Sequence, residues 1–187
     1  MLNQCRRTAT SFHKRILPSR LIAFSSPQGK EIFREALLDG AMESYFPLSE
    51  QFITQSEPSY CSISSLAMVL NALNYDPKKV WKGAWRWVSE ETLQCDSREV
   101  CGHSLDKIIK EGLHFHEFES LARCHGVSIT SIRVPAQREG HSADCEKGLK
   151  KFREVVQTVS ASSAADTFIV TNYSRKVLDQ TGTFKGK

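Results

Sequence analysis

Cys61 is the residue best suited to do chemistry, because its side chain is nucleophilic and the surrounding sequence predicts the start of a helix. The unpaired N–H groups at a helix N-terminus favour a thiolate, which is the form that attacks a carbonyl carbon. Gln55 lies six residues earlier, and its amide could donate a hydrogen bond to the oxyanion of an acyl transfer. A lone cysteine on a helix is more often a small buried residue. Type and spacing alone therefore leave both interpretations open.

The helix expected over residues 58–74 must position Cys61. Pro58 suits a first helical turn, and apolar residues then recur at helical spacing: Ile63, Leu66, Ala67, Leu70 and Leu73. The tryptophan-rich segment W-K-G-A-W-R-W follows at residues 81–87. Its aromatic side chains fit either core packing or the lining of a substrate cleft.

The other expected elements give an α+β order, with helices first and strands late. Ser26 and Pro27 predict a helix from residue 27 to 38, with Gly40 just beyond its end. We expect further helices over 89–94, 104–111, 115–125 and 147–159, strands over 127–134 and 167–173, and loops over 41–57 and 135–146.

Composition describes an ordinary globular chain of one domain, or of one domain with a short tail. It has 187 residues, of which 40% are hydrophobic and 25% charged. No apolar run approaches the roughly 18 residues of a membrane span, so no membrane association is expected. Six Lys and Arg residues and no acid fall in residues 1–30, which leaves a near-neutral body within the overall charge of +4. That distribution argues against nucleic-acid binding.

The basic, acid-free start fits either a mitochondrial transit segment or a basic disordered terminus. The six cysteines lie far apart in a chain too large to be a disulfide scaffold, which favours a reducing compartment. We therefore expect an intracellular, cytoplasmic protein, with the mitochondrial matrix as the alternative.

A second group of polar residues could suggest a metal site. Cys95, Cys101 and His103 lie close in sequence, and His114 and His116 form an H-x-H. Zinc sites usually contain a C-x-x-C pair or an equivalent matched half, and this set has neither. We predict no metal site here.

Long segments of the chain resemble the catalytic domain of phytochelatin synthases, which are glutathione γ-glutamylcysteinyltransferases of the papain-like cysteine peptidase superfamily. The most specific are Q-S-E-P-S-Y-C-S-I-S-S-L and D-P-K-K-V-W-K-G-A-W-R-W, which contain Gln55, Cys61 and the tryptophans. The resemblance begins at F-H-K-R-I-L-P-S and continues through F-S-S-P-Q-G-K-E-I-F, S-L-A-R-C-H-G and V-L-D-Q-T-G-T.

The resemblance implies that Cys61 is the family nucleophile and Gln55 the oxyanion-hole glutamine. In the family, the thiolate attacks the Cys-Gly bond of glutathione and releases glycine, and the γ-glutamylcysteinyl group passes to a second glutathione or to a phytochelatin peptide. No tightly bound cofactor is implied; heavy-metal ions (Cd, Zn, Cu) act as glutathione thiolates, which serve as substrate. The implied fold is an incomplete papain-like fold, with a helical N-terminal lobe and the first strands of the sheet lobe.

The sequence departs from the family where the general base should lie. The family motif Q-T-G-T-G-H-F reads Q-T-G-T-F-K-G-K here, so Phe184 replaces the glycine and Lys185 the base histidine. The orienting Asp is also absent, and the break inside a motif is typical of a truncated or alternatively spliced product. None of the other candidate bases matches the family position: His103, His114, His116, His125 and His141.

These observations predict a basic extension over 1–11, a partial catalytic domain over 12–183 and a divergent tail over 184–187. We expect the chain to be inactive or nearly so, for want of a base. Two alternatives stay open. One is a peptidase that only removes glycine from glutathione conjugates; the other is a non-catalytic, glutathione- or metal-binding form that associates with the full-length enzyme.

Overall fold

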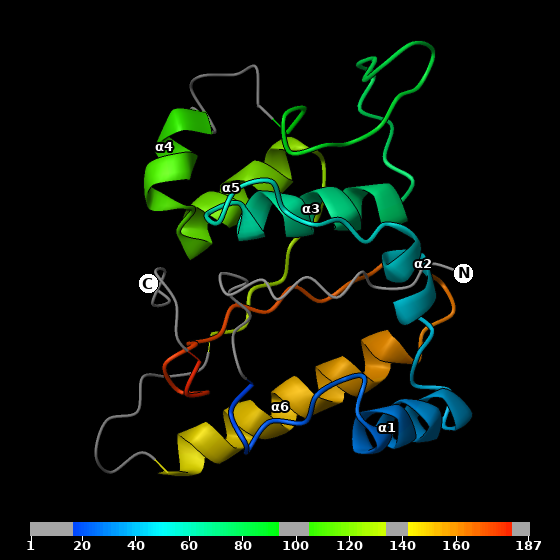
Figure 1. Ribbon diagram of the computed structural model, residues 1–187, viewed down its shortest axis with the longest axis vertical. Coiled ribbons are helices and arrows are strands. Elements are labelled where there is room, and N and C mark those ends of the chain that lie inside the picture. The colour runs from blue at the N-terminus through cyan, green and yellow to red at the C-terminus, as the bar shows by residue number, and fades with distance from the viewer. Residues whose placement is uncertain (1–16, 94–104, 134–141, 181–187) are drawn as a thin grey trace, which may run out of the picture. The chain divides into compact units, whose positions relative to one another are not determined.

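The computed structural model describes residues 17–93, 105–133 and 142–180 (Figure 1). The chain divides into two compact units, one of Met1–Glu31 with Tyr173–Lys187 and the other of Ile32–Asn172. The helices of the described residues are α1 (Pro27–Leu38), α2 (Tyr45–Glu50), α3 (Cys61–Ala72), α4 (Leu105–Glu111), α5 (Phe115–Cys124) and α6 (Ser142–Ser160). None of these helices is long and apolar enough to cross a bilayer.

Helix α1 has the bounds that its capping residues predict. The Gly29 N–H donates to Ser26 Oγ at 3.0 Å, which satisfies one of the unpaired donors of the first turn. At the other end Gly40 adopts φ +68°, and the Ala41 N–H donates back to the Ala36 carbonyl at 2.9 Å. This is the left-handed closure that favours glycine after a helix.

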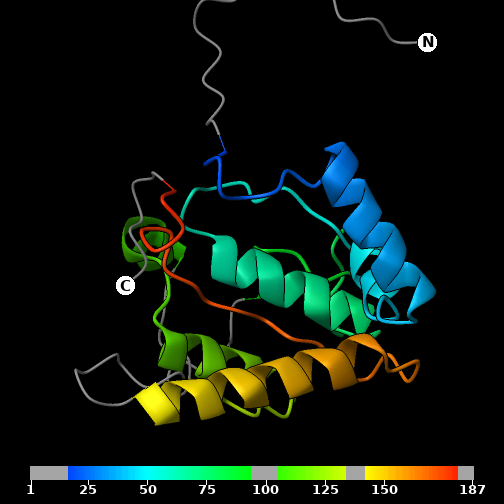
Figure 2. The ribbon, with the colours of Figure 1, turned by 90° about the horizontal axis from the view of Figure 1, so that it is seen from below.

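Helix α3 lies at the centre of the core of the second unit. Its residues Ile63, Leu66 and Leu70 are at most 1% exposed, as the apolar spacing predicts. Helices α2 and α5 both contact α3 (Figures 1 and 2). The buried cluster comprises Tyr60, Ile63, Leu66, Ala67, Leu70, Val88, Leu93, Ile108, Leu121 and Ala122. The helix that begins at Cys61 is therefore held by packing along most of its length.

The predictions for α4 and α5 are also confirmed. Both helices are followed by a glycine with positive φ, +71° at Gly112 and +75° at Gly126. At those angles a side chain would be strained, so the two glycines mark the ends correctly.

Three expectations for helices and loops are wrong. The loop expected over 41–57 contains α2, where Pro47 is tolerated because first-turn N–H groups have no intrahelical partner. The loop expected over 135–146 overlaps α6, which begins at Ser142. Of the helix expected over 89–94, the described residues 89–93 form a single turn, in which the N–H groups of Thr92 and Leu93 donate to the Ser89 carbonyl at 3.1 and 3.2 Å, and residue 94 lies outside the described residues.

The two expected strands are not observed in the described residues. Segments 127–133 and 167–173 have no strand pairing, and the isolated bridge between Lys82 and Trp85 is the one β contact there. A β-rich segment becomes a strand only when a neighbouring strand accepts its ladder hydrogen bonds, and these two segments have no such neighbour in the described part. The described molecule is mostly helical, so the strand half of the α+β prediction is wrong for these residues.

Candidate active site

Cys61 is the first residue of α3, and its side chain is exposed. The preceding residue, Tyr60, is buried and stands at the N-cap position. The nearest hydrogen-bonding neighbour of the thiol is Ser62 Oγ, 4.0 Å from the sulfur. A buried helix thus presents its first side chain outward, so the interpretation of Cys61 as a small buried residue is wrong.

Gln55 lies on the loop before α3 and is partly buried. Its Nε2 donates to the Glu57 carbonyl oxygen at 2.7 Å. An amide nitrogen carries two hydrogens, so this bond orients the group and leaves a second N–H for another acceptor. Its role as oxyanion donor stays a prediction.

Glu90 joins the two segments that flank Cys61, although its sequence context gives no sign of this. The Ser56 N–H lies 3.3 Å from each Glu90 carboxylate oxygen, and the Ser56 hydroxyl also donates to the carboxylate. The hydroxyl of Ser64, in the first turns of α3, lies within hydrogen-bonding range of the other carboxylate oxygen and of the Tyr60 carbonyl oxygen, the latter at 2.8 Å, so its single hydrogen is shared between two acceptors. The carboxylate therefore connects the residue next to Gln55 with the helix that carries Cys61.

The segment that carries Glu90 is itself anchored to α3. Asn71 is buried, and its amide forms two hydrogen bonds with the Val88 backbone: Nδ2 to the carbonyl at 2.9 Å and Oδ1 from the N–H at 3.1 Å. Val88 and Leu93, on either side of the Glu90 turn, are both buried in the core. The turn is thus fixed at both ends.

The tryptophan-rich segment does not pack into the core. Trp81, Trp85 and Trp87 are all exposed. The segment is a tight turn in which the Trp81 N–H donates to the Trp85 carbonyl at 2.8 Å, and the Lys82 ammonium lies 4.9 Å from the centre of the Trp81 ring. The core-packing interpretation is wrong here, while cleft lining stays untested.

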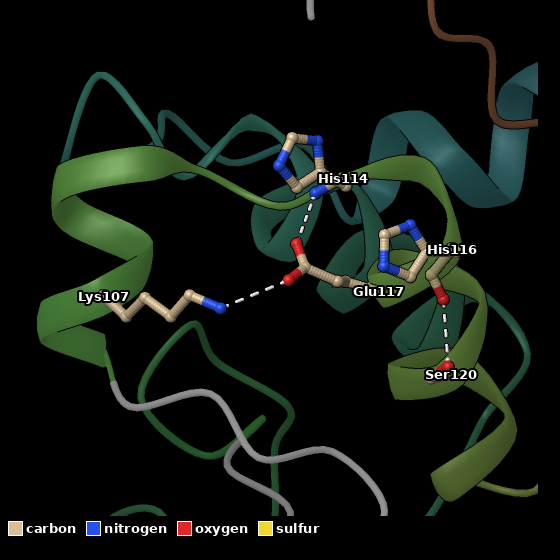
Figure 3. Close-up of polar contacts among 5 residues, drawn as sticks. All are labelled: Lys107, His114, His116, Glu117 and Ser120. Carbon is tan, nitrogen blue, oxygen red and sulfur yellow. Dashed lines mark hydrogen bonds and ion pairs between the residues drawn. The ribbon is translucent and has the colours of Figure 1, made fainter.

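None of the described histidines forms a hydrogen bond with the Cys61 thiol. The His114 and His116 rings stack with centroids 5.9 Å apart. Figure 3 shows the Glu117 carboxylate beside them, accepting from the backbone N–H of His114 at 2.6 Å and paired with the Lys107 ammonium at 3.3 Å.

His125 is half-buried. Its ring packs edge-on against Tyr75, and its Nε2 lies 3.4 Å from the Leu93 carbonyl oxygen. Burial, aided by the charge of Lys79, lowers the pKa of His125 despite the Leu93 contact. Among the described residues no histidine comes within hydrogen-bonding range of the Cys61 sulfur; His103 and His141 lie outside those residues.

Some of the residues considered for a metal site lie outside the described residues and some lie within them. Cys95, Cys101 and His103 lie outside the described residues. Within the described ranges, no group of three or more His, Cys, Asp or Glu side chains could hold a metal ion. Cys124 is disulfide-bonded, whereas Cys61 and Cys145 are free.

Comparison with known proteins shows where this chain belongs. The family model described as phytochelatin synthase matches residues 12–185. The chain is 39% identical over 172 residues to the glutathione gamma-glutamylcysteinyltransferase of Schizosaccharomyces pombe, covering 92% of this chain and 37% of that relative. It is 41% identical to glutathione gamma-glutamylcysteinyltransferase 1 of Lotus japonicus, covering 91% of this chain and 31% of the relative. It is 39% identical to glutathione gamma-glutamylcysteinyltransferase 1 of Arabidopsis thaliana, covering 92% of this chain and 32% of the relative.

The chain thus spans about a third of the length of these relatives, whose shares are 37%, 31% and 32%. An exposed cysteine at the start of a buried helix lies inside the matched region, as does the glutamine six residues before it. The chain belongs to the phytochelatin synthase family.

Proposed function

We propose that this chain carries the nucleophile and the oxyanion donor of a glutathione γ-glutamylcysteinyltransferase, Cys61 and Gln55 respectively. The observation that carries the proposal is the exposed thiol of Cys61 at the first residue of α3. The relatives that match over most of the chain are named for this transferase activity.

The proposed reaction is the one that the family resemblance implies, with Cys61 and Gln55 in the family roles. The Cys61 thiolate attacks the carbonyl carbon of the Cys-Gly bond of glutathione, and the carbonyl oxygen gains negative charge. The second N–H of Gln55 stabilises that charge. The C–N bond then breaks, glycine leaves with a proton on its amine, and a γ-glutamylcysteinyl thioester remains on Cys61.

The second half of the reaction restores the thiol. The amine of another glutathione, or of a phytochelatin peptide, attacks the thioester carbonyl, and the C–S bond breaks. Heavy-metal ions enter as glutathione thiolates, so they belong to the substrate, and no tightly bound cofactor is required.

Glycine is a poor leaving group unless its amine is protonated, so efficient turnover needs a histidine base and an orienting carboxylate. In residues 1–187 the position that matches the family histidine is Lys185. We therefore propose that the polypeptide of these 187 residues forms phytochelatins far more slowly than the family does.

The proposal includes the papain-like arrangement of the family. In that arrangement a cysteine stands at the N-terminus of a buried helix. Helix α3 supports it, because Cys61 is its first residue and Leu66 and Leu70 are at most 1% exposed.

The test is to incubate the purified chain with glutathione and cadmium and to measure released glycine and thiol oligomers separately. A second protein should carry a family tail with the family His and Asp, and Cys61→Ser should be made in both. We expect oligomers from the tailed protein alone, and their loss in its Cys61→Ser form, by several orders of magnitude.

Other outcomes decide between the alternatives. Glycine release without oligomers would indicate a peptidase that acts on glutathione or its conjugates. Glutathione binding without turnover in either protein would favour a regulatory form. Turnover by the 187-residue chain that vanishes with Cys61→Ser would show that another residue serves as the base.

A further inference from the structure

The Glu90 carboxylate is the acceptor on which two separate segments around the candidate site converge. Ser56 reaches it with both its backbone N–H and its hydroxyl, and the Ser64 hydroxyl, whose single hydrogen is shared with the Tyr60 carbonyl oxygen, also lies within hydrogen-bonding range of it. Hydrogen bonds to an ionised acceptor are roughly twice as strong as those between neutral groups. Glu90 therefore fastens the loop before Cys61 to the helix after it.

Glu90 can do this because its own backbone is fixed. The buried Asn71 side chain holds the Val88 backbone through two hydrogen bonds, at 2.9 and 3.1 Å. On the other side, the Thr92 hydroxyl accepts from the Ser89 N–H at 2.7 Å and closes the turn. Leu93 then enters the core, where it is 3% exposed. The segment that carries the carboxylate is therefore held against α3 by hydrogen bonds on one side of Glu90 and by core packing on the other.

From these contacts we propose that Glu90 is a positioning residue for acyl transfer: it sets where the Gln55 amide lies relative to the Cys61 sulfur. The inference rests on the proposed function, since it gives Glu90 a role only through Gln55. Ser56 is the residue next to Gln55, so the tether acts one peptide unit away from the oxyanion donor.

Acylation is sensitive to such a tether because an oxyanion donor must lie about 2.7–3.1 Å from the developing charge. A misplacement of about 1 Å can cost on the order of 100-fold in rate. Alkylation of the same thiol by iodoacetamide is a displacement at a CH₂ group and forms no oxyanion. The ratio of acylation to alkylation at Cys61 therefore reports the oxyanion donor separately from the reactivity of the thiol.

The experiment uses the full 187-residue chain. p-Nitrophenyl acetate is the acylating probe, because its leaving group departs without a proton and needs no histidine. Acylation is followed as a single-turnover release of p-nitrophenolate, corrected with Cys61→Ser, and alkylation is followed by mass spectrometry of the Cys61 peptide. The variants are Gln55→Ala, Glu90→Gln, the double variant and the control Glu91→Gln. Glu91 is exposed, and within the described residues it makes no hydrogen bond or ion pair.

We expect Gln55→Ala and Glu90→Gln each to lower the ratio by about tenfold or more, while the alkylation rate stays near that of the parent chain. The double variant should lose no more than Gln55→Ala alone, because Glu90 acts through Gln55. Glu91→Gln should match the parent. Ser56→Ala, which removes one of the tethering hydroxyls, should lower the ratio in the same direction and replaces Glu90→Gln if that variant does not fold.

Two results would overturn the inference and leave the proposed function standing. One is an unchanged ratio in Glu90→Gln and Ser56→Ala while Gln55→Ala lowers it. The other is an equal loss of acylation and alkylation in both tether variants, which would make Glu90 a structural residue. An unchanged ratio in Gln55→Ala would instead overturn the oxyanion role of the proposed function, and the positioning role with it.

Discussion

Helices α3 and α6 have the same kind of apolar stripe in sequence but very different surroundings. On α3, Ile63 and Leu66 are each 1% exposed. On α6, Leu149 is 47% and Phe152 37% exposed. Apolar residues at helical spacing indicate a helix in both cases, yet burial depends on the elements that pack against that face. The stripe predicts the helix, and its partners decide how much stability the helix contributes.

The difference in burial matters for function because the candidate site is built on α3, the more deeply buried of the two helices. Cys61 begins α3, and the Glu90 turn is held to α3 by Asn71. A nucleophile and its oxyanion donor must be held to within a fraction of an ångström. A helix held by a continuous core can provide this, whereas one with a half-exposed apolar face is held less firmly.

The largest effect is expected from a matched pair of side-chain truncations to alanine, one on α3 and one on α6. Leu66→Ala should lower the free energy of unfolding by about 2–5 kcal/mol, because it removes a fully buried side chain and leaves a cavity. Leu149→Ala should lower it by less than about 1 kcal/mol, because nearly half of that side chain is already in water. Urea unfolding followed by circular dichroism measures both. Equal losses would show that α6 is as firmly packed as α3.

The parts of the molecule that could be predicted are those with local causes. The bounds of α1 follow from Ser26 and Gly40, and the apolar spacing correctly predicts a helix through Ile63 and Leu70. The start of that helix is predicted three residues too early, because Pro58 lies in the turn before α3 and the helix begins at Cys61. Such signals act within a turn or two of the chain, so their effect does not depend on residues far away in the sequence.

The parts that could not be predicted depend on residues far apart in sequence. Segments 127–133 and 167–173 have strand-like composition, but a strand is defined by its partner. The Glu90 contacts reach Ser56 across 34 residues, and a lone glutamate after an aromatic segment gives no sign of them. The exposed tryptophans illustrate the same limit, since residue type favours burial only when a core is near.

A second test uses the pH dependence of stability to probe the packing next to α3. His125 packs against Tyr75, just beyond α3, and burial lowers its pKa from the usual 6.5. The folded state therefore binds this proton less readily than the unfolded state. The contribution of neutral His125 to the free energy of unfolding is fully present above pH 6.5, and it is lost as the pH falls through that value towards the folded-state pKa.

The measurement is urea unfolding at pH 7.5, 6.5 and 5.5 for the parent chain and for His125→Gln. The parent should lose stability across this series more steeply than the variant, and the exposed His116→Gln control should keep the parent's slope. Parallel slopes for the parent and His125→Gln would show that His125 is equally solvated in both states.

The smallest expected effect compares one cysteine from each region. Cys61 is exposed at the first residue of α3, whereas Cys145, in the first turn of α6, is partly buried. We expect iodoacetamide to label Cys61 severalfold faster at pH 7, because access and the helix N-terminus act together there. Mass spectrometry of a labelling time course measures both peptides in one sample, so protein and reagent concentrations cancel. Urea below the unfolding transition sharpens the contrast: loosening of α6 should raise the Cys145 rate before the Cys61 rate changes. Equal rates in buffer would mean that neither exposure nor position distinguishes Cys61, and simultaneous changes in urea would mean that the two helices open as one cooperative unit.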